Sequence, residues 1–350
     1  MRRRIRNKKE DKHHPKAGML KDRPVISTSL SLYLLFAVIC FSLTGCGKKC
    51  IRIGFAQSGH ESDWRTLSQD YAEEAFSKEK GFLLSVSDAD NYPPYQTEAV
   101  REFIASGCDR ILIDPLPSEE WGEILAEAEV AGIPVILINR HIKGTDKYAA
   151  WYGPDYEEEG RACGEEVLRL ANKDDAVYVI EGPVGSEPGE GRLKGIKAVL
   201  SETGRGISLS AAGDFTINGG KSAMKEIAER LKEKDVSGEP EQESDSGIPK
   251  GVLICMNDNT ALGAISALRD MGIRPGDPEG IRIVSFNAQY SGLKAVLDGE
   301  IASDIESGPE AVLRAAEDMV SGDVPEGEHP NEVRVYTGDN VTKDLLEGRR

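Results

Sequence analysis

The sequence has few of the residues that build metal centres and catalytic sites. Six cysteines and five histidines occur in 350 residues, and after residue 46 the cysteines match no zinc-binding spacing. Histidines 60, 141 and 329 are scattered, and no serine lies in a Gly-x-Ser-x-Gly elbow. We therefore expect no metal, no cofactor and no enzyme activity. Cys163 and Cys255 lie in apolar segments and are expected to be buried free thiols, with a disulfide as the alternative in an exported protein.

Basic residues are also scarce after residue 46. The sequence has 43 Lys and Arg and 60 Asp and Glu, of which ten basic and three acidic residues precede Cys46, so the remainder carries a formal charge of −24. Nucleic-acid binding needs clustered Lys and Arg that displace counterions from phosphates, so this surface would repel a duplex. We expect the negative charge to serve solubility, and it does not imply a cationic ligand.

An apolar run from about residue 30 follows a basic N-terminal region and ends at Leu43-Thr44-Gly45-Cys46. This combination predicts an export signal over residues 1–45, and the run is short of the ~20 apolar residues that a membrane span needs. Leu-Thr-Gly-Cys resembles the lipobox of bacterial lipoproteins, which implies cleavage before Cys46 and a lipid anchor on that cysteine. An uncleaved signal anchor and a start at Met19 remain open, and both leave the functional part after Cys46.

The rest of the chain, about 300 residues, is longer than one hydrophobic core usually supports, so two lobes are expected. Short apolar runs alternate with amphipathic segments, which predicts parallel doubly wound sheets. The predicted strands are residues 51–57, 82–87, 110–114, 134–139, 176–181, 207–212, 251–256 and 281–286. The predicted helices are residues 62–80, 95–106, 118–131, 155–171, 190–202, 219–234 and 259–271.

The α/β pattern restarts after residues 152–154, and residues 301–336 return two short strands around a helix near 309–321. We therefore expect the two lobes to be joined by several crossovers. The N-terminal lobe is expected to comprise residues 46–152 and about 306–332, and the C-terminal lobe residues 153–305 and about 333–350.

Two polar segments are expected to be solvated. Residues 236–249 are rich in Ser, Gly, Glu, Asp and Pro, which predicts a surface loop. The acidic run at residues 157–159 opens a predicted helix, where negative charge suits the helix dipole. We expect this first turn to face solvent, where it is also able to meet a transporter.

Ligands of parallel sheets bind beyond the carboxyl ends of the strands, so the residues that follow each strand are the candidates for a site. They are unusually polar and aromatic: Glu61, Trp64, Arg65, Asp114, Asn139, Arg140, Arg192, Phe215, Asn257 and Asn287. Carboxylates, guanidinium groups and aromatic rings together suit the hydroxyls and apolar C–H faces of a sugar. Helix capping is the alternative for each Asn and Asp. Arg140 and Arg192 oppose the helix dipole and so require an anionic or polar partner, which we expect to be the ligand.

Several of these segments also occur in a known family. They are Gly54-Phe55-Ala56-Gln57-Ser58-Gly59, Glu61-Ser62-Asp63-Trp64-Arg65-Thr66, Ala131-Gly132-Ile133-Pro134-Val135-Ile136-Leu137, Glu157-Glu158-Glu159-Gly160-Arg161, Gly213-Asp214-Phe215-Thr216 and Asn257-Asp258. With them the chain resembles the periplasmic binding proteins of sugar ABC importers, in the ribose and galactofuranose branch. The Glu-Ser-Asp-Trp-Arg-Thr segment is the most specific of these matches.

The resemblance implies a type I periplasmic binding fold, shared with the cores of LacI-type repressors, that closes on a monosaccharide similar to galactofuranose or ribose. It also implies delivery of the sugar to an ABC permease by a monomeric, extracytoplasmic, lipid-anchored protein. A sugar sensor that reports to a membrane receptor or histidine kinase is the alternative. A repressor is disfavoured because an export signal, and not a helix-turn-helix, precedes the first strand.

The resemblance further implies roles for particular residues. Trp64 and Arg65 would line the first lobe, and Arg140 matches the family's strand-end arginine. The resemblance also adds Glu306, in the late crossover, at the position where family members bind ring or anomeric hydroxyls of the sugar. Most members have Asp where Asn139 and Asn287 stand, so the pocket would be more positive and a ligand with a carboxylate or phosphate becomes conceivable.

Overall fold

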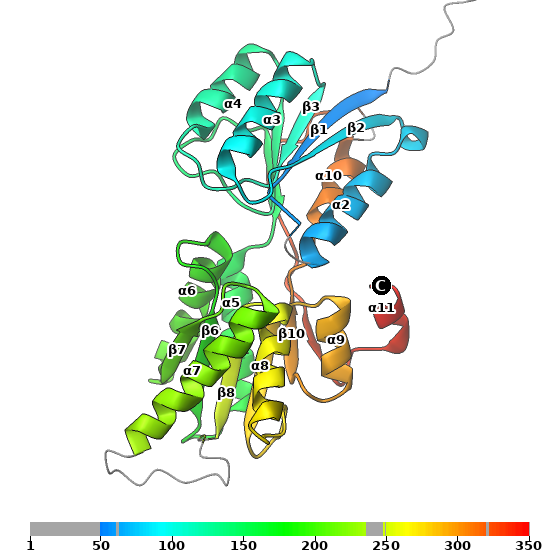
Figure 1. The fold of residues 1–350 in the computed structure, drawn as a ribbon. Coiled ribbons are helices and arrows are strands. Elements are labelled where there is room, and N and C mark those ends of the chain that lie inside the picture. The colour runs from blue at the N-terminus through cyan, green and yellow to red at the C-terminus, as the bar shows by residue number, and fades with distance from the viewer. Residues whose placement is uncertain (1–49, 61–62, 236–247, 249, 320–321, 350) are drawn as a thin grey trace, which may run out of the picture. The chain divides into compact units, whose positions relative to one another are not determined.

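The computed structural model describes residues 50–60, 63–235, 248, 250–319 and 322–349. Cys50–Arg350 form one compact unit, which is built on two six-stranded sheets (Figure 1). The predicted export signal, the predicted lipid attachment at Cys46, the candidate ligand residue Glu61 and nearly all of the predicted loop 236–249 lie outside the described residues.

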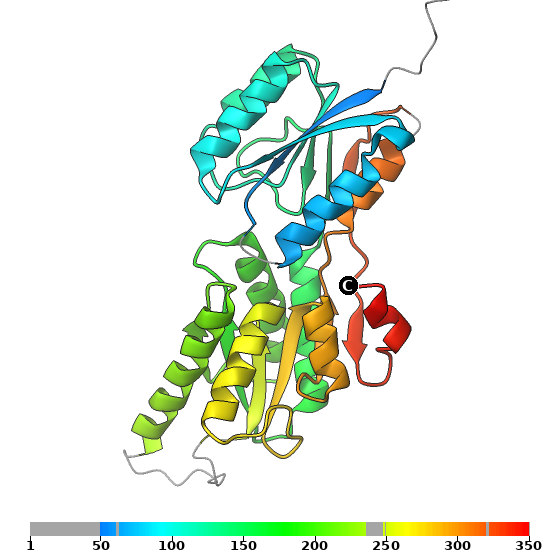
Figure 2. The ribbon, with the colours of Figure 1, turned by 45° about the vertical axis from the view of Figure 1, so that its right-hand side comes forward.

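The first sheet is entirely parallel, with strand order β11-β5-β4-β3-β1-β2. Its strands are β1 (Ile51–Gln57), β2 (Phe82–Asp88), β3 (Arg110–Ile113), β4 (Val135–Ile138), β5 (Ala150–Gly153) and β11 (Gly327–Pro330). Helices α2 (Asp63–Ala75) and α10 (Ala311–Met319) lie side by side on one face, and α3 (Pro93–Ala105) and α4 (Trp121–Val130) lie on the other (Figure 2).

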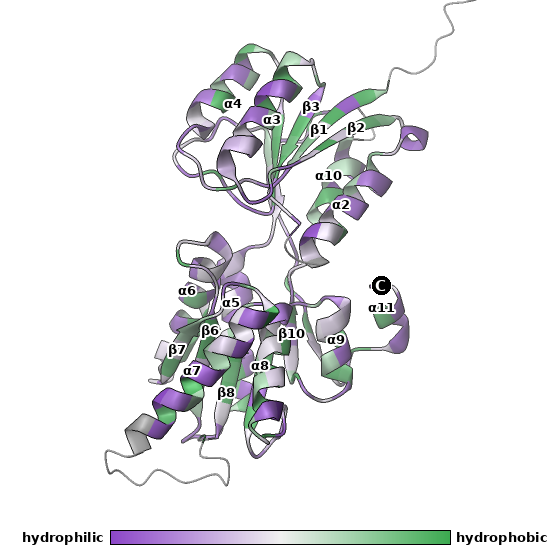
Figure 3. Cartoon of the chain, viewed as in Figure 1, coloured by the Kyte–Doolittle hydropathy of each residue, from purple (hydrophilic) through white to green (hydrophobic). Residues whose placement is uncertain are grey.

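Both faces of this sheet are buried because successive side chains of a strand point to opposite sides. Phe55 packs under α2 and α10, whereas its neighbour Ala56 packs under α3 and α4. The four residues of β4 are all buried, which is why this strand reads as an uninterrupted apolar run. In Figure 3 the central strands are accordingly green, and the helices carry purple segments as well.

The second sheet has strand order β12-β10-β9-β8-β6-β7, with only its edge strand β12 antiparallel. Its strands are β6 (Ala176–Glu181), β7 (Leu209–Ala212), β8 (Gly251–Cys255), β9 (Ile281–Asn287), β10 (Ser303–Glu306) and β12 (Val335–Thr337). The helices are α5 (Tyr156–Leu170), α6 (Glu187–Glu202), α7 (Ile217–Asp235), α8 (Asp258–Asp270), α9 (Tyr290–Leu297) and α11 (Lys343–Glu347). Helices α5 and α6 cover one face, and α7, α8 and α9 cover the other.

The chain passes between the two sheets after β5, after β10 and after β11. The fold class predicted from the sequence, two doubly wound parallel lobes of the type I periplasmic binding kind, is therefore confirmed. Strand membership places residues 303–306 and 335–337 in the second sheet and residues 327–330 in the first.

Several elements differ from the sequence prediction. The helix predicted over residues 62–80 ends at Ala75 and is followed by a short 3-10 helix, Lys78–Lys80, which Gly81 closes with a φ of 93°. Strands β5 and β11 and helices α9 and α11 were not predicted as separate elements. They have between four and eight residues, which is too few to show a period in the sequence.

Two predictions about the chain's chemistry can be compared with the structure. Cys163 and Cys255 are buried free thiols, as expected, and burial raises the pKa of both. Within the described residues, no helix combines the length and the apolar character that crossing a membrane requires.

Candidate functional site

A cavity of about 1000 Å³ lies at the carboxyl ends of strands from both sheets. Most of the predicted ligand-binding residues line it: Trp64, Arg65, Asn139, Arg140, Arg192, Phe215, Asn257 and Asn287. The two sheets contribute to it in similar numbers. Residues that were predicted because they follow strand ends, and that are up to 223 positions apart in the sequence, therefore line one cavity.

The first sheet contributes a group that we call the first wall, formed by Arg65, Asp114 and Asn139. The Arg65 guanidinium forms an ion pair with Asp114, and both side chains are almost completely buried. Asp114 also accepts hydrogen bonds from Ser58 Oγ and from Asn139 Nδ2, each at 3.1 Å. Asp114 itself does not line the cavity, so its carboxylate orients Arg65 and Asn139 from behind.

Tyr156, at the start of α5, connects the first wall to the second half of the molecule. Its hydroxyl donates to Asn139 Oδ1 at 2.5 Å and approaches the Asn139 carbonyl oxygen at 3.2 Å. Burial raises the pKa of Tyr156 well above its usual range, with the charge of Arg140 opposing the shift. The tyrosine is therefore a neutral donor at every physiological pH, and both ends of the Asn139 amide are engaged.

The second sheet contributes the second wall, formed by Arg192, Glu159 and Asn287. Arg192 Nε donates to Glu159 at 2.8 Å, Nη1 to the Met256 carbonyl oxygen at 2.6 Å, and Nη2 to Asn287 Oδ1 at 3.4 Å. Its guanidinium also lies 4.4 Å from the ring centroid of Phe286. Arg192 does have the anionic partner that its position requires, but that partner is Glu159 and belongs to the protein.

The placement of Glu159 corrects the prediction that residues 157–159 form a solvated turn. Glu158 is exposed, but Glu159 is 1% exposed and paired with Arg192. Burial raises the pKa of Glu159, and the charge of Arg192 opposes that shift. The expectation failed because the fourth residue of α5, Glu159, points toward a buried guanidinium that lies 33 residues later in the sequence.

Asn257 illustrates the capping alternative. It caps α8, because its Oδ1 accepts from the backbone N–H of Thr260 at 2.9 Å, while its Nδ2 donates to the Phe215 carbonyl oxygen at 2.9 Å. Phe215 presents an aromatic side chain to the same cavity. Asn257 thus lines the cavity and serves the fold at the same time.

Strained backbone is concentrated around this cavity. Most of the non-glycine residues with positive φ in the described chain line it: Asn91, Asn139, Asp214, Phe215 and Asn287. Non-glycine residues rarely adopt this conformation, and Asn and Asp adopt it most readily. The amides at positions 139 and 287, with φ of 71° and 109°, therefore suit the backbone there, and such strain gathers at functional sites.

Two further predicted residues have distinct placements. Arg140 lines the cavity, is half-buried, and its side chain makes no hydrogen bond or ion pair within the described part of the chain. Glu306, which the resemblance assigned to the site, does not line the cavity. Its carboxylate is paired with Arg349 and Arg334. The neighbouring Ser307 does line the cavity, and its carbonyl oxygen accepts from Trp64 Nε1 at 2.6 Å.

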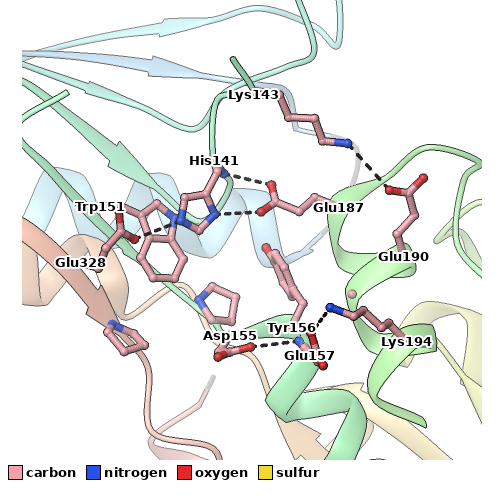
Figure 4. A pocket seen from close by; sticks show the side chains of 13 residues that line it. His141, Lys143, Trp151, Asp155, Tyr156, Glu157, Glu187, Glu190, Lys194 and Glu328 are labelled. Atoms are coloured by element: carbon pink, nitrogen blue, oxygen red, sulfur yellow. Dashed lines mark hydrogen bonds and ion pairs between the residues drawn. The ribbon is translucent and has the colours of Figure 1, made fainter. Parts of the chain in front are cut away.

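A second, smaller cavity of about 510 Å³ adjoins the first and shares His141, Lys143, Tyr156 and Glu187 with it (Figure 4). His141 Nδ1 lies 2.8 Å from Glu187, its backbone N–H donates to the same carboxylate at 2.9 Å, and Nε2 lies 3.0 Å from Glu328. The ring stacks on Trp151 at 4.2 Å. We call this group of His141, Glu187 and Glu328 the clasp, since it ties a loop of the first sheet to α6 of the second.

The clasp is electrostatic. Burial lowers the pKa of His141, whereas the hydrogen bonds to Glu187 and Glu328 raise it. The two hydrogen bonds outweigh burial, so the pKa lies above its usual value. Lys143 at the same rim lies 3.8 Å from Glu190. Sequence reasoning missed Tyr156, Glu159, Glu187 and Ser307, whose roles depend on partners that lie far away in the sequence. Within the described residues no group of His, Cys, Asp and Glu could hold a metal ion.

Comparison with known proteins gives consistent results. Residues 53–321 match the family model described as a periplasmic binding protein domain. The galactofuranose-binding protein of Escherichia coli is 32% identical over 267 residues, which are 74% of this chain and 78% of that protein.

Solved structures agree with this sequence match. A crystal structure of a galactofuranose-binding protein superposes with a TM-score of 0.74 at 28% identity, covering 85% of this chain and 98% of that one. The periplasmic binding component of the arabinose ABC transporter from Shewanella sp. ANA-3, bound to α- and β-L-arabinofuranose, gives a TM-score of 0.73 at 29% identity, with 85% and 95% coverage.

Proposed function

Because the chain belongs to the family of periplasmic binding proteins, which bind solutes, we propose that it captures a monosaccharide similar to galactofuranose or ribose outside the cytoplasm. The observation that carries this proposal is the cavity between the two sheets. It combines aromatic side chains, Trp64 and Phe215, with the available guanidinium of Arg140. The relatives named above, which bind galactofuranose or arabinofuranose, support the sugar class.

The two walls keep the cavity in shape before a sugar enters. Arg65 and Arg192 are each neutralised by a buried carboxylate, Asp114 and Glu159, so their side chains are fixed without a ligand. Arg140 is then the cavity-lining arginine that is available to form forked hydrogen bonds with ligand oxygens. Such preorganisation reduces the conformational entropy that the side chains lose when a ligand binds.

We further propose that the protein is a lipoprotein anchored through Cys46 and that its sugar-loaded form delivers the sugar to an ABC permease. The lipobox-like segment before Cys46 supports the anchor. A Cys46→Ser variant is expected to move from the membrane fraction to the soluble fraction of the cell envelope. If loss of a neighbouring sensor kinase, and not of a permease, abolished the response of cells to the sugar, the transport role would be wrong.

A thermal-shift screen with monosaccharides tests the binding proposal. A ligand that binds only the folded state at about 100 times its Kd stabilises that state by about 2.7 kcal/mol, so a cognate sugar should raise the Tm by several degrees. Arg140→Ala should abolish this shift without lowering the Tm of the sugar-free protein. Arg101→Ala is the matched control, because Arg101 pairs with Glu120 and Glu127 on the surface. No response to any sugar would contradict the proposal.

A further inference from the structure

Three asparagines that line the large cavity already use their amide oxygens within the protein. Asn139 Oδ1 accepts from the Tyr156 hydroxyl, Asn257 Oδ1 accepts from the backbone of its own helix, and Asn287 Oδ1 accepts from Arg192. An unengaged asparagine side chain offers a sugar hydroxyl both a donor and an acceptor. In the structure all three acceptors face other protein groups.

The carboxylates near the inner lining are used as well. Asp114 and Glu159 lie behind the lining, where Arg65 and Arg192 pair with them. Neither side chain is more than 1% exposed. A ligand in the cavity therefore finds no free carboxylate oxygen among the described residues of the inner lining.

The other acidic residues of the cavity lie at its rim. Glu187 accepts two hydrogen bonds from His141, and Asp214 accepts from the backbone and hydroxyl of Thr216. Glu119 is exposed to solvent. None of these groups supplies a buried acceptor to the interior.

Donors, in contrast, remain available. The Arg140 guanidinium carries several N–H groups, and its side chain has no hydrogen-bond or ion-pair partner in the described part of the chain. Asn287 Nδ2 likewise has no recorded acceptor there, because only its oxygen is engaged. Arg140 and Asn287 thus bring one uncompensated positive charge and free donors to the cavity, while the amide and carboxylate oxygens named above are engaged by the protein.

We propose that the preferred ligand is an anionic sugar, which presents a carboxylate or phosphate group to Arg140 in the cavity between the two sheets. A sugar hydroxyl carries a hydrogen that needs an acceptor, and leaving it unpaired in a buried site loses affinity. An ionised acid group accepts only, and its planar or forked oxygens match a guanidinium in two parallel hydrogen bonds. This inference rests on the proposed function, because it assumes that the same cavity holds the sugar.

Isothermal titration of the full mature chain with matched pairs of ligands tests the inference. The pairs are D-galactose with D-galacturonate, D-glucose with D-glucuronate, and D-glucose with D-glucose 6-phosphate, with galactofuranose and ribose as further neutral sugars. We expect at least one acid to bind tenfold or more tightly than its neutral partner. The uronates and the phosphate distinguish the two sources of the negative charge.

Two variants connect this preference to the residues. Arg140→Gln should remove the preference for the acid, and Arg140→Lys should restore part of it, because lysine keeps the charge but loses the fork. Asn287→Asp adds a carboxylate to the lining and should weaken the acid at least fivefold relative to its neutral partner. Arg101→Gln, on the surface, should change neither value.

The outcomes separate the two proposals. Tight binding of a neutral sugar with no preference for its acid would overturn the anionic ligand and leave the proposed function standing. Absence of binding by both members of every pair, and by galactofuranose and ribose, would contradict the proposed function itself. A preference that survives Arg140→Gln would show that the acid group binds elsewhere, and would also overturn the inference.

Discussion

The two walls of the cavity use the same three kinds of residue in opposite ways. Each has a buried arginine, a buried carboxylate and an asparagine with positive φ at the end of a central strand. In the first wall the Asn139 amide nitrogen faces the carboxylate of Asp114. In the second wall the Asn287 amide oxygen faces the guanidinium of Arg192.

This difference shows that the two asparagines have different roles. Beside Asp114 the side chain must be a donor, and a carboxylate would add like charge in a buried site. Beside Arg192 the side chain must be an acceptor, which a carboxylate also provides. The difference between the walls therefore predicts which changes each wall tolerates.

The largest expected effect is at Glu159. Glu159→Gln removes the charge that neutralises Arg192 in a site with almost no exposure, and breaking a buried ion pair on one side costs about 3–5 kcal/mol. Urea unfolding should show a fall of this size in the free energy of unfolding. Glu158→Gln, one residue earlier and exposed, should change it by no more than about 0.5 kcal/mol.

A double variant keeps this prediction testable if the Glu159→Gln protein does not fold. Glu159→Gln combined with Arg192→Met removes both charges and should recover much of the lost stability. Equal stabilities of the Glu159→Gln and Glu158→Gln variants would show that the Arg192–Glu159 pair does not organise the second wall.

A smaller effect is expected where α5 packs on α6. A Cβ added at Gly160 would lie 2.1 Å from the Arg192 carbonyl oxygen, so Gly160→Ala must push the two helices apart and should cost about 1–3 kcal/mol. Gly122→Ala, in α4, meets open space and should stabilise the protein by up to about 1 kcal/mol. Thermal unfolding of the two variants should therefore shift in opposite directions, and a stable Gly160→Ala protein would contradict the close contact.

The same substitution in both walls sharpens the comparison further. Asn139→Asp places a carboxylate beside Asp114 and should lower the free energy of unfolding at pH 7 by about 1–3 kcal/mol. Asn287→Asp meets Arg192 and should change it by no more than about 0.5 kcal/mol. Equal effects of the two changes in denaturant unfolding would refute the distinction between the walls.

The smallest expected effect concerns the clasp, which connects the two halves. The pKa of His141 lies above its unfolded value, so its charged form stabilises the fold fully below about pH 6.5, and this contribution is lost as the pH rises through the folded pKa. The Tm difference between wild type and His141→Gln should thus be larger at pH 5.5 than at pH 8.5. A difference independent of pH would mean that His141 acts by packing on Trp151 alone.

The sequence predicted the parallel lobes because each strand is a short apolar run, as in residues 51–57 and 251–256, followed by an amphipathic helix. It also predicted where polar residues such as Asn139 and Asn287 collect, because strand ends share one edge of a sheet. It could not predict that Glu159 pairs with Arg192, or that Glu306 turns away toward Arg349. Such pairings depend on side-chain orientation and on packing between segments that only the folded chain brings together.

The most direct test of the central claim is a crystal structure of the mature protein with the tightest-binding sugar. The account predicts that the sugar lies between the two sheets, with oxygens bonded to Arg140 and a C–H face against Trp64 or Phe215. A sugar bound elsewhere, with the cavity between the sheets left without it, would contradict the account.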